Sequence, residues 1–179
     1  LISSSDYNLE GKRYGALALA NMTVCEAFHS IILDNEGPEA LFALSNSYDD
    51  LESRRFAAMA MANLSANAST HERLVEMGGL QCIIALAYDS DQTIHGRAAA
   101  ALRAFSATGD NNTKIVHEGG LEPLCRLLLS EDLVILHETT ACMCNLSLAD
   151  ESKFELTKSG VVPPLISLIQ NEDSTIANY

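Results

Sequence analysis

The sequence predicts an all-α fold in which similar helical repeats stack into a solenoid. The first reason is a regular spacing of glycines, with 41 residues from each to the next: Gly37, Gly78, Gly119 and Gly160. The second is that the stretches between them follow one helical pattern, and none alternates polar and apolar residues as a half-buried strand does. A fixed period of this length is typical of stacked repeats, each of which buries its apolar face against its neighbours.

Each repeat is expected to hold a short first helix, a glycine turn, a second helix, a polar loop and a long third helix. The central copies place these helices at residues 69–77, 80–88 and 92–108, and at residues 113–118, 121–129 and 133–148. The flanking copies place helices at residues 39–46 and 51–66, and at residues 161–169. Glycine adopts the left-handed conformation that ends a helix, so the glycine turn separates the first helix from the second.

The helix boundaries carry residues that suit them. Prolines fall near the starts of second helices, where a missing N–H is harmless: Pro38, Pro123, Pro163 and Pro164. The loops before the third helices contain Asp and Ser, as at residues 89–91 and 130–132, and these residues favour turns and helix caps.

The whole chain is expected to form one array. Its repeats are predicted at residues 26–67, 68–108 and 109–149, between partial repeats at residues 1–25 and 150–179. Residues 1–2 match the end of a second helix, and the chain stops within a third helix. Because terminal repeats normally carry a polar outer face, the chain is expected to be an excerpt from a longer array.

Composition disfavours several classes of function. Of the 179 residues, 47% are hydrophobic, which is enough for a packed core. The net charge of −13 disfavours binding to nucleic-acid phosphates and a basic membrane-surface role. No signal peptide or membrane-spanning apolar stretch is visible, and five cysteines without a CxxC pair are typical of reduced structural thiols. We therefore expect an intracellular, cytoplasmic protein without direct membrane insertion.

No catalytic or metal site is expected. The segment His137-Glu138-Thr139-Thr140-Ala141 begins like the HExxH of a zinc protease, but Ala141 replaces the second histidine. The other histidines lie in separate helices without metal-ligand spacing, and the glycine pairs lack the strand that precedes a phosphate loop. The chain is predicted to be no enzyme and to need no cofactor.

The long helices end in a shared motif: Asn21-Met22-Thr23, Asn63-Leu64-Ser65, Ala104-Phe105-Ser106 and Asn145-Leu146-Ser147. Similar phrases surround two glycine turns, VEMGGL at residues 75–80 and VHEGGL at residues 116–121. With these features the chain resembles the armadillo-repeat family, to which β-catenin and importin-α belong. The resemblance implies a right-handed superhelix whose third helices line a concave groove, used as a scaffold or adaptor for protein binding.

The resemblance also implies which residues bind a partner. In this family the Asn near the end of the third helix clamps the backbone of an extended peptide, since an amide both donates and accepts hydrogen bonds. The matching residues are Asn21, Asn63 and Asn145, with a gap at Ala104. These asparagines could instead act as caps or spacers between helices.

Helical geometry predicts the neighbours of these asparagines. At about 100° per residue, positions four, seven, eight and eleven before each Asn lie near its face. The first two long helices repeat one set there: Glu10, Arg13, Tyr14 and Leu17, then Glu52, Arg55, Phe56 and Met59. The later helices replace it with Thr93, Gly96, Arg97 and Ala100, and with Val134, His137, Glu138 and Ala141. The N-terminal half is therefore the better candidate surface.

Other roles are open for several of these residues. Tyr14 and Phe56 could be packing residues between repeats, and Arg13 and Arg55 could pair with the Glu three positions earlier. Four leucines point away from the Asn face and are expected in the core: Leu19, Leu64, Leu102 and Leu146. Importin-α carries Trp where this chain has Leu17, Met59, Ala100 and Ala141, so binding of a nuclear localisation signal in that manner is not expected.

The predicted function is a non-catalytic scaffold that binds an extended peptide or a partner helix in the concave groove. The predicted groove residues are Asn21, Asn63, Asn145, Tyr14, Phe56, Arg13, Arg55, Leu17, Met59 and Arg97. The alternative is a structural spacer or adaptor, of the kind found in cilia and on organelle membranes, that contacts partners by its convex face or edges.

Overall fold

The computed structural model describes residues 4–47 and 50–170, and every regular element in these ranges is helical. The long third helices are α1 (Ser4–Met22), α4 (Leu51–Ala66), α7 (Gln92–Ser106) and α10 (Leu133–Leu146). The second helices are α3 (Gly37–Ser45), α6 (Gly79–Leu86), α9 (Leu121–Leu127) and α12 (Val162–Gln170). The first helices are α2 (His29–Asp34), α5 (His71–Glu76), α8 (Asp110–His117) and α11 (Asp150–Lys158), and the 3-10 turns η1 (Glu26–Phe28) and η2 (Ala68–Thr70) precede the first two of them.

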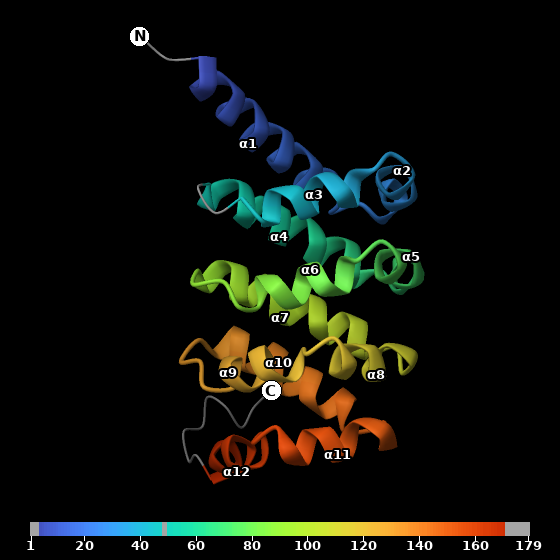
Figure 1. The fold of residues 1–179 in the computed structure, drawn as a ribbon, viewed down its shortest axis with the longest axis vertical. Coiled ribbons are helices and arrows are strands. Elements are labelled where there is room, and N and C mark those ends of the chain that lie inside the picture. Colours follow the sequence, from blue (N-terminus) through green and yellow to red (C-terminus); the bar gives the residue numbers. More distant parts are fainter. Residues whose placement is uncertain (1–3, 48–49, 171–179) are drawn as a thin grey trace.

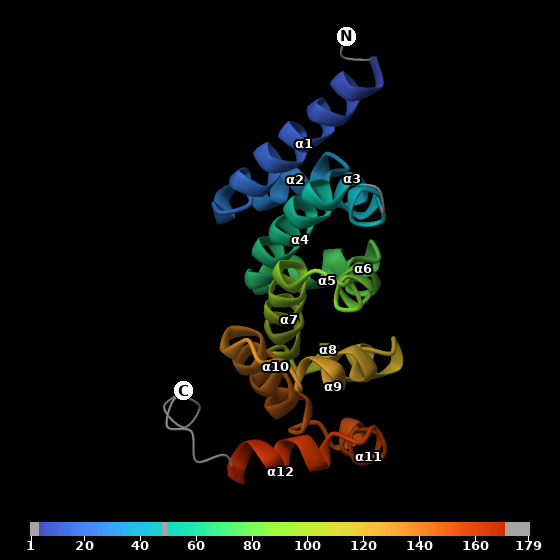
Figure 2. The same ribbon diagram turned by 90° about the vertical axis from the view of Figure 1, so that its left-hand side faces the viewer.

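The helices form a right-handed α-solenoid, as the sequence predicts. Helices of one kind recur down the longest axis of the molecule (Figure 1). Figure 2 shows α4, α7 and α10 on one side of the stack and α3 and α6 on the other. Because α4 packs along both α1 and α7, and α7 packs along α10, the long helices form one continuous layer.

The core lies where the long helices meet each other and the second helices. Small residues such as Ala60 and Ala99 are completely buried, and they let the long helices approach closely. Leu64, Leu102 and Leu146 are also completely buried, as expected, whereas Leu19 is only partly buried and packs against the core.

Three of the four predicted glycine turns are confirmed. Gly78, Gly119 and Gly160 have φ values of +90°, +84° and +80°, a left-handed conformation that other residues adopt only with strain. In the first turn the left-handed residue is Glu36, with φ of +56°, and not Gly37. The prediction that Gly37 occupies the same position as Gly78 is therefore wrong.

Gly37 is needed for a close approach instead. A Cβ added at Gly37 would lie 2.6 Å from the carbonyl oxygen of Ile32, and one added at Gly79 would lie 2.8 Å from that of Leu74. Neither position has room for a side chain, because the second helix starts directly against the first. Gly37 thus corresponds to Gly79, and the first repeat is one residue longer than the glycine spacing suggests.

Aspartates cap two of the long helices, as the loop composition predicts. Asp91 Oδ1 accepts a hydrogen bond from the backbone N–H of Ile94 at 3.2 Å. Asp132 Oδ1 accepts from the backbone N–H groups of Val134 and Ile135 at 2.9 and 3.2 Å. Asp50 precedes α4 in the same way, but its carboxylate accepts from the hydroxyl of Ser53.

Among the described residues no single helix is long and apolar enough to cross a membrane. One pair meets that length and composition only when taken together, residues 8–22 and 26–34, and it is bent by 114°. No three His, Cys, Asp or Glu side chains within residues 4–47 and 50–170 are grouped to hold a metal ion. The predictions about the two chain ends concern residues outside the described ranges, and the repeat boundaries stay predictions.

Candidate binding face on the long helices

The predicted groove residues all lie on long helices, and none is fully buried. Asn21, Tyr14 and Arg97 are exposed, and the others are half-buried: Arg13, Leu17, Arg55, Phe56, Met59, Asn63 and Asn145. Because α1, α4, α7 and α10 stack in one layer, residues at matching positions of these helices share one side of it. We call these ten residues, together with Ala100, Ala104 and Glu138, the groove face.

Asn63 joins α4 to α1. Its Nδ2 donates to Thr23 Oγ1 at 3.1 Å and to the carbonyl oxygen of Ala20 at 3.4 Å. The Thr23 hydroxyl donates its own hydrogen to the Ala20 carbonyl at 2.7 Å, so it can only accept from Asn63. Since a carbonyl never donates, these contacts fix which end of the amide is the nitrogen. The nitrogen of Asn63 faces the preceding repeat.

Asn145 repeats this arrangement between α10 and α7. Its Nδ2 donates to Ser106 Oγ at 3.0 Å, and the Ser106 hydroxyl donates to the carbonyl oxygen of Arg103 at 2.7 Å. The amide oxygens of Asn63 and Asn145 have no partner among the described residues and are not buried, so both contact solvent. The nitrogens therefore act as spacers between repeats, while the oxygens stay available as acceptors.

The other two positions in this series differ. Asn21 is exposed, and within the described part of the chain its side chain makes no hydrogen bond. Ala104 has no amide, and Ser65, which matches Thr23 and Ser106, donates to the Met61 carbonyl at 2.7 Å. The interruption predicted at Ala104 thus removes a contact between α7 and α4.

A hollow of about 620 Å³ opens at this interruption. Alanines from three long helices line it: Ala66, Ala100, Ala104, Ala107 and Ala141. Arg103, Glu138, Cys144 and Asn145 complete its walls. The sequence predicted a missing asparagine here, whereas the hollow depends on small residues that only the fold brings together.

Arginines join two of the long helices to the loop that precedes the next one. Arg13 Nε lies 2.9 Å from Asp50 Oδ1, and Arg55 binds Asp91 through two contacts of 3.2 and 2.7 Å. The expected pairing with a Glu three positions earlier occurs for Arg55, which lies 2.8 Å from Glu52, whereas Arg13 pairs with Asp50 instead. Sequence reasoning missed that these aspartates bind arginines, although an aspartate directly precedes each of the last three long helices.

Both aspartates are held in the ionised form. Burial alone would raise the pKa of Asp50, but hydrogen bonds from Ser53 and Arg13 outweigh it and hold the pKa below its usual value. The hydrogen bond from Arg55 is the main cause that lowers the pKa of Asp91. Arg13 and Arg55 are therefore already neutralised and offer a partner little free charge.

The junction between α7 and α10 lacks such a link. Gly96 stands where α1 and α4 carry arginine, and Asp132 accepts from Gln92 Nε2 at 3.3 Å instead. Arg103 crosses this junction to the two carboxylate oxygens of Glu138, at 3.0 and 3.1 Å. Arg97 is exposed and has no ion pair within the described residues.

Buried histidines hold the C-terminal ends of α1 and α4, where the asparagines lie. His29 Nε2 lies 2.8 Å from the carbonyl oxygen of Thr23, and His71 Nε2 lies 2.7 Å from that of Ser65. In the next repeat Asn111 takes this role, because its Nδ2 donates to the carbonyl oxygen of Phe105 at 3.3 Å, while Asn112 donates to the carbonyl oxygen of Asn145 at 3.2 Å. A buried side chain of the following repeat thus contacts a carbonyl near the end of each of the long helices α1, α4 and α7.

Comparison with known proteins shows a match to one armadillo repeat and a likeness in fold over the whole chain. A model of the Armadillo/beta-catenin-like repeat matches residues 113–148. An engineered protein from the Northeast Structural Genomics Consortium is 28% identical and has a TM-score of 0.83, over 98% of this chain and 72% of that one. Residues 113–148 thus match an armadillo repeat, and the fold of the chain is similar to that of engineered repeat proteins. A search of curated proteins found no match.

Two designed armadillo repeat proteins, each 20% identical, share the fold of this chain. One was designed for modular peptide recognition and has a TM-score of 0.85, over 98% of this chain and 73% of that one. The other is in complex with the peptide (KR)4 and has a TM-score of 0.84, over 98% of this chain and 72% of that one. Armadillo repeats are generally non-catalytic scaffolds that commonly bind peptides.

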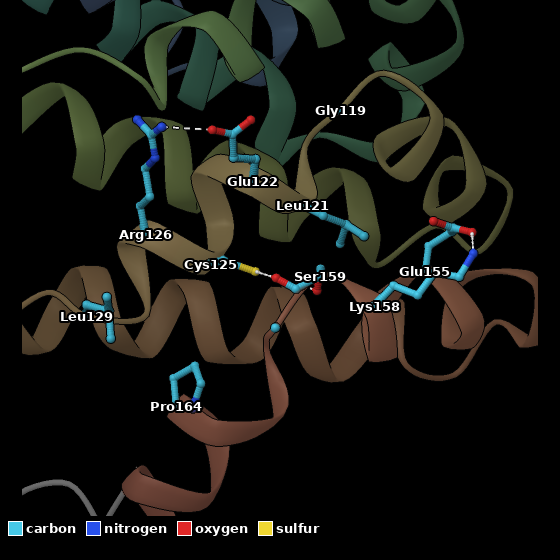
Figure 3. Close-up of a pocket in the computed structure, with 11 residues that line it drawn as sticks. Gly119, Leu121, Glu122, Cys125, Arg126, Leu129, Glu155, Lys158, Ser159 and Pro164 are labelled. Carbon is cyan, nitrogen blue, oxygen red and sulfur yellow. Dashed lines mark hydrogen bonds and ion pairs between the residues drawn. The ribbon is translucent and has the colours of Figure 1, made fainter.

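The described part of the chain has a second hollow, of about 640 Å³, away from the groove face. Figure 3 shows it between α9 and the turn that joins α11 to α12, with Leu129 and Pro164 beside it. Two ion pairs line it, Arg126 with Glu122 at 2.7 Å and Lys158 with Glu155 at 3.5 Å. No predicted groove residue contributes to this hollow.

Proposed function

We propose that this armadillo array is a non-catalytic interaction scaffold that binds an extended peptide along the groove face. The orientation of the Asn63 and Asn145 amides carries the proposal. Each nitrogen is bonded to the preceding repeat, which leaves each oxygen as a fixed acceptor in contact with solvent. An extended peptide presents backbone N–H groups whatever its sequence, so two such acceptors would hold its main chain.

The two amide oxygens are pre-organised in the free protein. The hydrogen bonds to Thr23 and Ser106 already restrict the two asparagine side chains, so binding loses little of their rotamer freedom. The histidine contacts with the carbonyls of Thr23 and Ser65 also fix the ends of α1 and α4. Pre-organisation of this kind favours binding over an equally polar but mobile surface.

The solved complex with (KR)4 supports a peptide as the class of partner. The groove face of this chain favours a different peptide, because Glu52 is paired with Arg55 and Glu138 with Arg103. Few free carboxylates are left on this face to attract a lysine–arginine sequence. We therefore expect weak binding of (KR)4 compared with peptides selected on this chain.

Peptide display followed by substitution tests the proposal. Peptides are selected from a random decapeptide phage library on the purified chain, and the affinity of the most enriched one is measured by fluorescence anisotropy. Asn63→Ala and Asn145→Ala are each expected to weaken binding about five- to tenfold, which corresponds to one lost hydrogen bond of about 1 kcal/mol.

Two matched controls separate the oxygen from the nitrogen. Thr23→Val and Ser106→Ala remove the hydroxyl that the amide nitrogen contacts and leave the amide oxygen in place. They are expected to lower stability by about 1 kcal/mol and, because the amide loses its restraint but keeps its oxygen, to weaken peptide binding less than the asparagine variants do. Wild-type affinity in both asparagine variants, with unchanged helix content, would contradict the proposal.

The hollow in Figure 3 favours a second candidate, a spacer or adaptor that contacts partners on the face opposite the groove. Leu129 and Pro164 provide apolar surface at this hollow, and the charges beside them are neutralised within two ion pairs. Photo-cross-linking of the selected peptide separates the two functions. Cross-links to α4, α7 and α10 support the groove, and cross-links to α9 and α12 support the adaptor.

A further inference from the structure

The hollow at Ala104 and the free Arg97 indicate the chemistry of the peptide, and this inference rests on the groove function proposed above. We propose that the hollow holds one bulky apolar side chain of the bound peptide and that Arg97 pairs with an acidic side chain beside it. The occupant is thus an extended peptide in which an apolar residue and an acidic residue are near neighbours.

The shape of the hollow favours an apolar side chain. Leu17 and Met59 fill the positions of α1 and α4 that correspond to Ala100, and Asn63 corresponds to Ala104. On α7 both side chains are reduced to a methyl group, and Ala141 of the facing helix is equally small. Apolar surface buried here gains about 25 cal/mol per Å² that leaves water.

The charges at the hollow favour an acid beside that side chain. Arg103 and Glu138 neutralise each other through two contacts of 3.0 and 3.1 Å. Arg97 makes no ion pair among the described residues, and it lies one helical turn from Ala100 on the same face of α7. An unpaired guanidinium binds a carboxylate well through its planar donors.

The net charge of −13 does not cancel this local preference. Charges on distant surfaces are screened beyond about 8 Å at physiological ionic strength, whereas Arg97 would contact the peptide directly. Asn145 lines the same hollow, and its free oxygen can accept the backbone N–H of the residue that fills it. One peptide residue would thus be held by its side chain and its main chain together.

Two substitutions fill the hollow with residues that α4 carries at the same positions. Ala100→Met and Ala104→Asn are each expected to bind the most enriched peptide at least tenfold more weakly than wild type. Both should also lose the preference for that peptide over a version with Ala at its apolar position. Because α4 accommodates Met and Asn at these places, the variants are expected to fold, which thermal melting checks.

A charge exchange tests Arg97. Arg97→Glu is expected to weaken binding of the enriched peptide at least fivefold. A peptide with Lys in place of its acidic residue should restore the affinity of that variant and bind wild type poorly. Equal affinity of wild type for the acidic and the lysine peptide would overturn the assignment of Arg97.

Thiol labelling tests occupancy without any substitution. Cys144 lines the hollow and is exposed, and Cys25, between α1 and η1, is an exposed control. Burial raises the pKa of Cys82 to about 11 and that of Cys142 to about 12, so these two thiols alkylate slowly at neutral pH. Saturating peptide should slow iodoacetamide labelling of Cys144 at least fivefold and leave Cys25 unchanged.

The outcomes separate this inference from the proposed function. If Asn63→Ala weakens binding but Ala100→Met, Ala104→Asn and Cys144 labelling show no effect, the peptide lies in the groove without using the hollow. That result overturns the inference and keeps the function. If the library yields no peptide that is sensitive to Asn63→Ala, both the function and the inference fall.

Discussion

Arginine–aspartate pairs join α1 to the residue before α4 and α4 to the residue before α7, and within the described residues no such pair joins α7 to the residue before α10. Arg13 and Arg55 reach Asp50 and Asp91, whereas α7 has Gly96 at the corresponding position. The long helices nevertheless pack along one another equally closely at α4–α7 and α7–α10. Apolar packing therefore makes the solenoid, and the polar contacts can change from junction to junction without changing the fold.

The difference also decides what each part of the groove face offers. Near α1 and α4 the arginines are already neutralised, so the face there presents mainly amide oxygens and half-buried side chains. Near α7 and α10 the face presents the hollow at Ala104 and Arg97, which has no ion pair among the residues that the structure describes. The sequence predicts that the N-terminal half is the better candidate surface, which stays a prediction, whereas the hollow that we propose for the peptide side chain is formed mainly by residues of α7 and α10.

The largest change in the free energy of unfolding is expected from replacing a buried histidine that holds the end of a long helix. His71 is 4% exposed, stacks on Phe105 with ring centroids 4.5 Å apart, and contacts the Ser65 carbonyl. His71→Ala leaves a cavity and an unpaired carbonyl, so we expect the free energy of unfolding to fall by about 3 kcal/mol. Urea unfolding followed by circular dichroism measures this. His117→Ala, at an exposed site, is the control and should change stability by less than about 0.5 kcal/mol.

The two capping aspartates should differ by the arginine contact. Asp91→Ala removes a helix cap and the partner of Arg55, and we expect a loss of about 2 kcal/mol, since Arg55 is partly solvated. Asp132→Ala removes a helix cap and only a neutral contact with Gln92, and a loss of about 1 kcal/mol is expected. Equal losses in urea unfolding would show that the Arg55 contact contributes nothing.

Low pH should remove the stabilisation that the ion pair between Asp91 and Arg55 gives to the α4–α7 junction. The pKa of Asp91 is lowered in the folded chain, so its ionised form stabilises the fold above the unfolded-state pKa of about 3.8. The stabilisation is lost as the pH falls through the folded-state pKa. The difference in unfolding free energy between wild type and Asp91→Asn should be constant above about pH 5 and shrink below about pH 4. An Arg55→Gln background should reduce this pH dependence, and an unchanged dependence would contradict the assignment.

The smallest effect is expected from placing an arginine at Gly96, where it could pair with Asp132 as Arg13 and Arg55 pair with Asp50 and Asp91. Gly96→Ala should stabilise the chain by about 0.5–1 kcal/mol, because glycine is unfavourable within a helix and the added Cβ would lie 3.7 Å from Ile135 Cγ1. Gly96→Arg should add a further few tenths of a kcal/mol if the new side chain reaches Asp132. Thermal melting of the double variant Gly96→Arg with Asp132→Asn tests whether the addition comes from that pair.

Sequence patterns predicted the fold almost completely. The 41-residue period and the positions of Leu64, Leu102 and Leu146 were enough to place the helices and their buried faces. The first glycine turn was wrong because Glu36 adopts a left-handed conformation that its residue type does not signal. Side-chain identity predicts which conformations are favourable, and it does not exclude a strained one that packing compensates.

The candidate site was predictable only in part. The asparagine series could be aligned from the sequence, but the direction of each amide depends on Thr23 and Ser106 of the preceding repeat. The pairing of Arg13 with Asp50 and the hollow at Ala104 likewise join residues from different repeats. A periodic sequence shows what each repeat carries, whereas contacts between repeats depend on how far one helix lies from the next.

Backbone methylation of the selected peptide tests the central claim most directly. If the oxygens of Asn63 and Asn145 accept peptide N–H groups, N-methylation should weaken binding to wild type at least tenfold at two backbone positions. At each position the penalty should fall below about twofold in the cognate variant, Asn63→Ala or Asn145→Ala. Tolerance of methylation at every position, or penalties that persist unchanged in both variants, would contradict the account.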